Sequence, residues 1–179
     1  MWPLLILVAI VLAVFVIYNG LVKLKVAAES AWADIDVQLK RRYDLIPNLV
    51  ETVKGYAAHE RGTLEAVIDA RSRAMSAVGP AEKGRAEGEL AGALKSLFAL
   101  AENYPQLRAA ENFGQLQGSL GQIEDAIQNA RRYYNAVVRD YNTRLQQFPS
   151  NLVALSFGFR QREFFEAGEE ERTVPRVSF

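Results

Sequence analysis

The chain has 179 residues, with 21 lysines and arginines against 21 aspartates and glutamates, so its formal net charge is zero. Hydrophobic residues make up 50% and charged residues 23%, which is typical of an ordered protein, and the length fits one domain. The absence of cysteine excludes disulfides, zinc–thiolate sites, iron–sulfur clusters and a thiol nucleophile. A single histidine excludes sites that need two imidazoles, and we expect no metal or cofactor.

An apolar segment begins the chain. The first 22 residues carry no charged side chain and would span roughly 33 Å as a helix, close to the hydrocarbon thickness of a bilayer. Trp2 stands near one end, and aromatic rings favour the membrane interface. A cleaved signal peptide is the alternative, but no basic residue precedes the apolar run. We predict a retained anchor at residues 1–22, with these candidate transmembrane residues: Leu4, Leu7, Val11, Phe15 and Tyr18.

The distribution of basic residues predicts the orientation of this anchor. Lys23 and Lys25 follow it directly and Lys40–Arg42 follow within about 20 residues, whereas nothing basic except the amino terminus precedes it. Because basic residues favour the cytoplasmic side, we expect a single-pass protein with its N-terminus outside and the rest of the chain in the cytoplasm.

Helical spacing of apolar residues continues beyond the anchor without a turn signal. The first break is predicted at Asp44–Asn48, where Pro47 either begins a new helix or kinks a continuous one. One helix is expected from there to Gly79-Pro80, and another from Ala81 to Ala101.

The clearest periodicity runs from Phe113 to Phe148. Alternate steps of three and four residues give positions that are apolar or aromatic except for Arg144, which is the pattern of a long heptad helix. We therefore expect an all-α protein in which a transmembrane helix continues into an elongated antiparallel bundle of about four long helices. The bundle is predicted at residues 23–166 and a mobile tail at 167–179.

Two rows of glycines interrupt the predicted helices. A glycine inside a helix costs about 1 kcal/mol relative to alanine, so both rows need a reason. One hypothesis is that they let two helices approach closely; the other is that residues 79–89 form a mobile loop and a frayed helix start. The rows are Gly84, Gly88 and Gly92, then Gly114, Gly118 and Gly121.

The central segment carries a family resemblance. Residues 37–50 read VQLKRRYDLIPNLV and residues 53–56 read VKGY, and this block resembles the signature of the LemA family. Shorter matching segments are Tyr18-Asn19, Tyr133–Asn135, Tyr141-Asn142, Phe148-Pro149 and Gly158-Phe159. The motif residues are Gln38, Arg42, Asp44, Pro47, Asn48, Gly55 and Tyr56.

The resemblance implies a bacterial inner-membrane protein with one N-terminal span, an outside N-terminus and a cytoplasmic helical bundle. It implies no established enzymatic activity and no cofactor. Magnetosome-associated members of the family suggest, by analogy only, a role in organising membranes.

No constellation in the sequence favours catalysis. His59-Glu60 is the only place in the sequence where a histidine stands next to a carboxylate residue. Asp34 and Asp36 are two residues apart and therefore lie on different faces of a helix. Glu124-Asp125 most simply belong to the outer face of the heptad helix. The basic cluster Lys40–Arg42 is interpreted as a solvated, ion-paired face, and the neutral net charge argues against nucleic-acid binding.

Phenylalanines gather after the heptad pattern. Because water disfavours their joint exposure, this segment either folds back over the bundle and closes its core, or forms a patch for a partner or the membrane. Folding back is the preferred interpretation. The residues are Phe148, Phe157, Phe159, Phe164 and Phe165.

These features predict a non-catalytic, membrane-anchored structural or scaffolding protein that self-associates and organises or remodels the membrane. Its expected partners are the lipid bilayer and further copies of itself. The alternative is an adaptor or sensor that binds an unidentified client or signalling protein through the cytoplasmic bundle, and a hydrolase is the third hypothesis.

Overall fold

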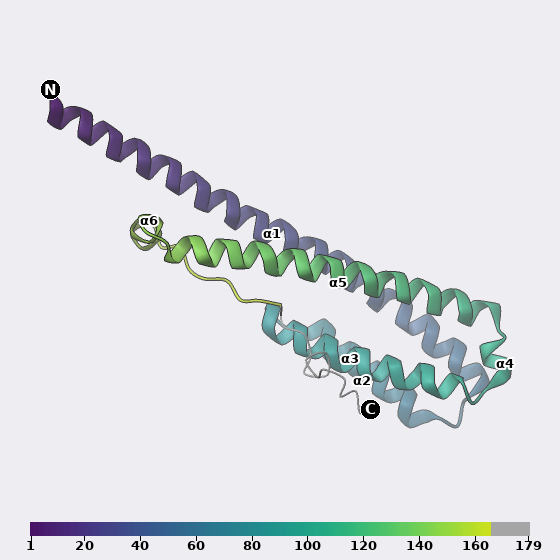
Figure 1. Cartoon of the computed structure of the whole chain (residues 1–179). Coiled ribbons are helices and arrows are strands. Elements are labelled where there is room, and N and C mark those ends of the chain that lie inside the picture. Colours follow the sequence, from purple (N-terminus) through teal and green to yellow (C-terminus); the bar gives the residue numbers. More distant parts are fainter. Residues whose placement is uncertain (166–179) are drawn as a thin grey trace, which may run out of the picture. The chain divides into compact units, whose positions relative to one another are not determined.

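The computed structural model describes residues 1–165, which contain helices and no strand. Figure 1 shows the order of the helices along the chain. They are α1 (Trp2–Tyr56), α2 (Arg61–Ser76), α3 (Pro80–Ala101), α4 (Pro105–Arg108), α5 (Glu111–Gln146) and α6 (Ser150–Ser156). The all-α prediction is confirmed, and the tail predicted at residues 167–179 lies outside the described residues.

The helices pack as two compact units. Unit 1 contains Met1–Ile35 and Ala130–Phe164, and unit 2 contains Asp36–Asn129 and Phe165. The two longest helices, α1 and α5, are therefore each divided between the two units, and each unit has its own buried residues.

Helix α1 continues through Pro47 without interruption (Figure 1). A proline has no N–H, so the carbonyl of Tyr43, four residues earlier, lacks its helical donor. Arg71 of α2 replaces that donor, since its Nε donates to the Tyr43 carbonyl at 2.8 Å. The interpretation of Pro47 as a site within one continuous helix is therefore the correct one.

The chain reverses at residues 57–60 instead, between α1 and α2. The prediction of one helix from the proline to Gly79 is wrong, because that stretch is shared between the end of α1 and the whole of α2. His59 lies exposed in this turn.

The break at Gly79-Pro80 occurs where the sequence predicted it. Gly79 has φ of 84°, a conformation that glycine adopts without steric cost, and Pro80 occupies the first turn of α3. Helices α2 and α3 pack against each other as a hairpin within unit 2.

The heptad pattern of α5 is correct over most of its length. Its buried residues in unit 2 are Phe113, Leu120 and Ile127, and those in unit 1 are Tyr134, Val138, Tyr141 and Leu145. The pattern fails at its end, where Arg144 is exposed and Phe148 lies beyond the helix. An α-helix turns every 3.6 residues, so the buried stripe drifts by one position relative to a strict heptad.

Close packing at the glycine rows is not observed at four of the six positions. A Cβ atom built at any of these four would meet no neighbouring atom within 4 Å: Gly92, Gly114, Gly118 and Gly121. Gly84, by contrast, is buried in α3. Of the alternative, the loop is wrong for residues 80–89, which belong to α3.

Candidate functional site

A buried ion-pair cluster forms the most polar part of the interior of unit 2. Arg42 of α1 follows Leu39 by three residues and precedes Ile46 by four, so the helical period turns its side chain inward. Glu87 of α3 lies three residues before Leu90, on the buried face. Both charged residues are only 5% exposed.

Arg42 bridges two carboxylates. Its Nη1 lies 3.1 Å from Glu87 Oε2, and its Nη2 lies 3.1 Å from Glu124 Oε2 of α5. A guanidinium can make both contacts at once because its donors form a planar fork. The three residues thereby connect α1, α3 and α5 within unit 2.

Tyr43 completes the cluster from the next position of α1. Its hydroxyl hydrogen-bonds to Glu87 and lies 3.3 Å from the Ala74 carbonyl, to which Lys83 Nζ donates at 3.1 Å. Burial raises the pKa of Glu87, and this effect outweighs the hydrogen bond from Tyr43 and the charge of Arg42, which both lower it. Burial and the neighbouring Glu87 likewise raise the pKa of Tyr43.

The cluster is internally satisfied. Among residues 1–165, no buried side-chain nitrogen or oxygen lacks a hydrogen-bond partner. A buried Arg with two carboxylates holds helices in register, because breaking one contact leaves a charge without its partner in a poorly solvated place.

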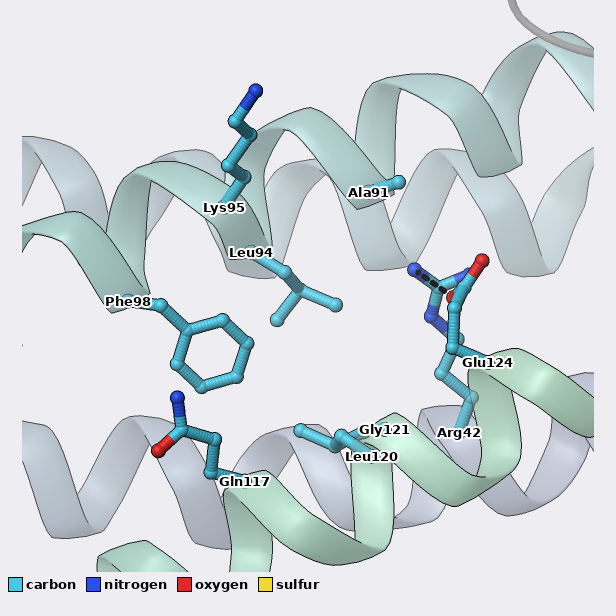
Figure 2. Close-up of a pocket in the computed structure, with 9 residues that line it drawn as sticks. All are labelled: Arg42, Ala91, Leu94, Lys95, Phe98, Gln117, Leu120, Gly121 and Glu124. Atoms are coloured by element: carbon cyan, nitrogen blue, oxygen red, sulfur yellow. Dashed lines mark ion pairs between the residues drawn. The ribbon is translucent and has the colours of Figure 1, made fainter. Parts of the chain in front are cut away.

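An open groove lies beside the cluster (Figure 2). Its volume is about 440 Å³. Figure 2 shows the ion pair of Arg42 with Glu124 near one end and Phe98 of α3 near the other, with Leu94 and Leu120 between them. The remaining lining residues are Ala91, Lys95, Gln117 and Gly121. This apolar groove with a polar end suits an apolar side chain or a helix surface, and residues 1–165 hold no group of three metal-binding side chains.

The predicted motif residues differ in how far they are buried. Arg42 enters the cluster and Gln38 is half-buried, so the interpretation of Lys40–Arg42 as a solvated face holds for its first two residues and is wrong for Arg42. The other motif residues are exposed: Asp44, Pro47, Asn48, Gly55 and Tyr56.

Sequence reasoning missed Tyr43 and Glu87 and placed Glu124 on an outer face, although Glu124 pairs with Arg42. A usable signal existed for Glu87. An acidic residue three positions before Leu90, in the leucine stripe of α3, is a charge on a buried face and requires a partner.

Unit 1 contains an aromatic cluster beside the predicted anchor. The Tyr18 ring centroid lies 4.9 Å from that of Phe157 and 5.7 Å from that of Phe159. Helix α6 contributes Val153 and Ala154 to a core with residues of α1 and α5: Leu21, Tyr141 and Leu145. The segment after α5 therefore returns to α1 within unit 1.

The five phenylalanines do not share one environment. Phe165 is 2% exposed and Phe159 packs against the core of unit 1, whereas Phe148 is 80% exposed. Phe157 and Phe164 are exposed as well, at 56% and 42%.

Polar side chains of α5 hold the extended segment after α6. The Asn142 amide donates to the Arg162 carbonyl at 2.9 Å and accepts from the Arg162 N–H at 2.9 Å. The Tyr134 hydroxyl donates to the Glu163 carbonyl at 2.9 Å. Arg162 also pairs with Glu29 of α1, so the segment after α6 is held by side chains of both α1 and α5 within unit 1.

The start of α1 has the properties of a membrane span. It belongs to the one helix within residues 1–165 that is long and apolar enough to cross a membrane, with a mean hydropathy of 2.8 in its most apolar window. Four of the candidate transmembrane residues, Leu4, Leu7, Val11 and Phe15, are 58–66% exposed, and Tyr18 is 36% exposed.

These features define a helical protein with an apolar N-terminal helix that continues into a packed helical domain. Residues 31–179 match the LemA family, and the chain belongs to that family.

The chain is similar in sequence to two magnetosome proteins and to a LemA protein. Magnetosome protein MamQ of Magnetospirillum gryphiswaldense is 26% identical over 200 residues, which cover 96% of this chain and 74% of that protein. Magnetosome protein MamQ 2 of Paramagnetospirillum magneticum is 26% identical over 199 residues, covering 95% and 73%. Protein LemA of Metamycoplasma hominis is 27% identical over 158 residues, covering 86% and 71%. None of these names denotes an enzyme, and together with the apolar helix they indicate a membrane-associated protein.

Proposed function

We propose that this protein is a non-catalytic structural protein of the bacterial inner membrane, which self-associates at the bilayer and organises it. In this proposal the N-terminus lies outside and the chain after the span lies on the cytoplasmic side. The observation that carries it is the exposed apolar surface of α1 from Leu4 to Val16, which continues without a break into the packed helix of unit 1.

That surface suits a lipid environment. Its large side chains are about half to two-thirds exposed, and water disfavours such an unbroken apolar surface. In a bilayer, the α-helix satisfies its own backbone hydrogen bonds and the side chains meet hydrocarbon. Because α1 is continuous through Val22, the span and the domain that follows it are joined by rigid helix instead of a flexible linker.

Two features support self-association. The groove in unit 2 is lined by the half-buried Phe98 and by the buried Leu94 and Leu120. Gly121 lies beside them, and a Cβ atom there would meet nothing within 4 Å. In this proposal a helix of a second copy packs against this surface, since a glycine lets a helix backbone approach closely. A shared membrane raises the effective concentration of such copies, so even weak contacts become populated.

The relatives support the placement at a membrane. Two of them are named as magnetosome proteins, and the third carries the name of the family. The ion-pair cluster supports a structural role, because its charges are used to connect three helices instead of facing the groove without partners.

The test is the mass of the full-length protein in lipid. We expect the protein in nanodiscs or native lipid particles to form oligomers, measured by mass photometry or native mass spectrometry. Gly121→Arg places a long charged side chain in the groove and is expected to lower the oligomer fraction. Gly55→Arg is the control, because Gly55 also lies within a helix, α1, has open space around it and is not among the residues that line this groove.

A strictly monomeric protein in lipid would contradict self-association. Equal oligomer fractions for Gly121→Arg and Gly55→Arg would remove the groove from the proposal. A stoichiometric complex with one different protein, in place of oligomers, would favour the adaptor function.

A further inference from the structure

We infer that α6 and the phenylalanines flanking it form a second membrane contact, embedded in the cytoplasmic leaflet beside the span. We call this surface the α6 patch; its residues are Phe148, Leu152, Leu155 and Phe157. The inference rests on the proposed function, because it requires the start of α1 to cross the bilayer.

The depth of α6 follows from its partners on α1. Val153 and Ala154 form a core with Leu21, and Val14 and Ile17 pack against that core. With the anchor ending near residue 22, Ile17 lies about 7.5 Å and Val14 about 12 Å inside that end, at ~1.5 Å per residue. A helix that shares a core with these residues lies within the hydrocarbon region or at its boundary.

Ring contacts place the same segment at the membrane interface. The Tyr18 ring, within the predicted span, lies 4.9 Å from the Phe157 ring by centroid distance. Aromatic side chains at this level are typical of the boundary between headgroups and acyl chains.

The residues of the α6 patch face away from the core of unit 1. Leu155 is 79% exposed and Phe148 is 80% exposed, while Leu152 and Phe157 are 55% and 56% exposed. The inward side of α6 is occupied by Ser150, Val153 and Ala154. Leu152 and Leu155 are two of the three exposed residues of α6, the third being Ser156, so its outward face is mostly apolar. Water does not favour such a face and a bilayer does.

Charge delimits the patch on both sides. No charged residue lies between Arg144 and Arg160, and both of these arginines are exposed. Basic residues at the two ends of an uncharged segment match a surface of anionic headgroups above hydrocarbon. The lipid bilayer is the occupant that we assign, because the patch continues the exposed apolar surface of the adjacent span, including Val16 at 67% exposure.

A second contact with the bilayer would restrict how the protein rotates and tilts in the membrane. A single helix can rotate about its axis and change its tilt, whereas a helix fixed to a second embedded segment cannot do so freely. The α6 patch would orient every copy of the protein in the same way relative to the membrane, which favours ordered lateral contacts.

The experiment uses depth-dependent fluorescence quenching in the full-length chain. The natural sequence has no cysteine, so a single Leu155→Cys or Leu152→Cys carries an environment-sensitive dye without background. Val11→Cys in the span is the positive control, and Tyr133→Cys is the aqueous control at 58% exposure in the same unit. The proteins are placed in phosphatidylcholine–phosphatidylglycerol vesicles containing lipids spin-labelled near the headgroup or deep in the acyl chain.

We expect strong quenching at Leu155 and Leu152 by the shallow spin label, deep-label quenching at Val11, and no quenching at Tyr133. Quenching at Val11 together with unquenched dye at Leu155 and Leu152 would overturn the α6 inference and leave the anchor intact. Unquenched dye at Val11 would overturn the anchoring proposal and the inference with it. Because these side chains are exposed, labelling does not disturb the core, and circular dichroism verifies the helix content.

Discussion

The hydrogen bond from Arg71 to the Tyr43 carbonyl makes a quantitative prediction about Pro47. The proline removes the backbone donor that this carbonyl would use in a regular helix, and the Arg71 Nε supplies another at 2.8 Å. Arg71→Met keeps much of the apolar stem and removes the donor. We expect it to lower the free energy of unfolding by about 1.5–3 kcal/mol, the range for a hydrogen bond to a charged group.

The same substitution is expected to cost less in a Pro47→Ala background. Alanine restores the backbone N–H, so the Tyr43 carbonyl regains its helical partner and no longer depends on α2. We expect the cost of Arg71→Met to fall by about 1 kcal/mol in that background, which is the coupling energy of a double-mutant cycle.

The assay is urea unfolding of the full-length protein in mild detergent, followed by circular dichroism. Arg73→Met is the matched control on the same helix: its Nε pairs with Glu89 at 3.0 Å, but both side chains are more than half exposed. An exposed pair contributes about 0–1 kcal/mol, and no coupling to Pro47 is expected. An equal cost of Arg71→Met in both backgrounds would refute the assignment of Arg71 as the replacement donor.

Glu87→Gln is expected to alter the pH dependence of stability. Burial raises the pKa of Glu87 in the fold, so the stability that its protonated form contributes is complete below the unfolded pKa and is lost as pH rises through the folded pKa. Urea unfolding from acid to neutral pH should therefore show the native chain losing stability relative to the variant; a constant difference would contradict the raised pKa. Asn142→Ala removes both hydrogen bonds to the Arg162 backbone and should cost about 1–3 kcal/mol, with faster amide exchange around Arg162. Thr143→Ala, at an exposed position, is its control, and unchanged exchange in Asn142→Ala would argue that Asn142 does not hold the segment after α6. For the orientation, a cysteine-reactive reagent that does not cross membranes should label Trp2→Cys in intact cells and Ile68→Cys only after lysis; the reverse pattern would invert the proposed topology.

Local patterns were sufficient for the helical class and for several boundaries. The apolar start of α1, the break at Gly79-Pro80 and most of the buried stripe of α5 follow from hydropathy, backbone preference and the helical period, which act between near neighbours in sequence. The reversal at residues 57–60 was missed because that turn contains neither glycine nor proline, whereas the proline at position 47 suggested a break ten residues too early.

Composition and periodicity within a single helix were enough to specify a helical protein with an uncharged apolar helix at its start. The interior partners, in contrast, could be identified only from the packed structure. Arg42 meets Glu87, 45 residues away, and α6 returns to Leu21 across most of the chain length. Such pairings depend on which helix faces pack together. A buried charge, or a carbonyl whose helical donor is missing because of a proline, finds a partner only when another helix brings a polar group within about 3 Å.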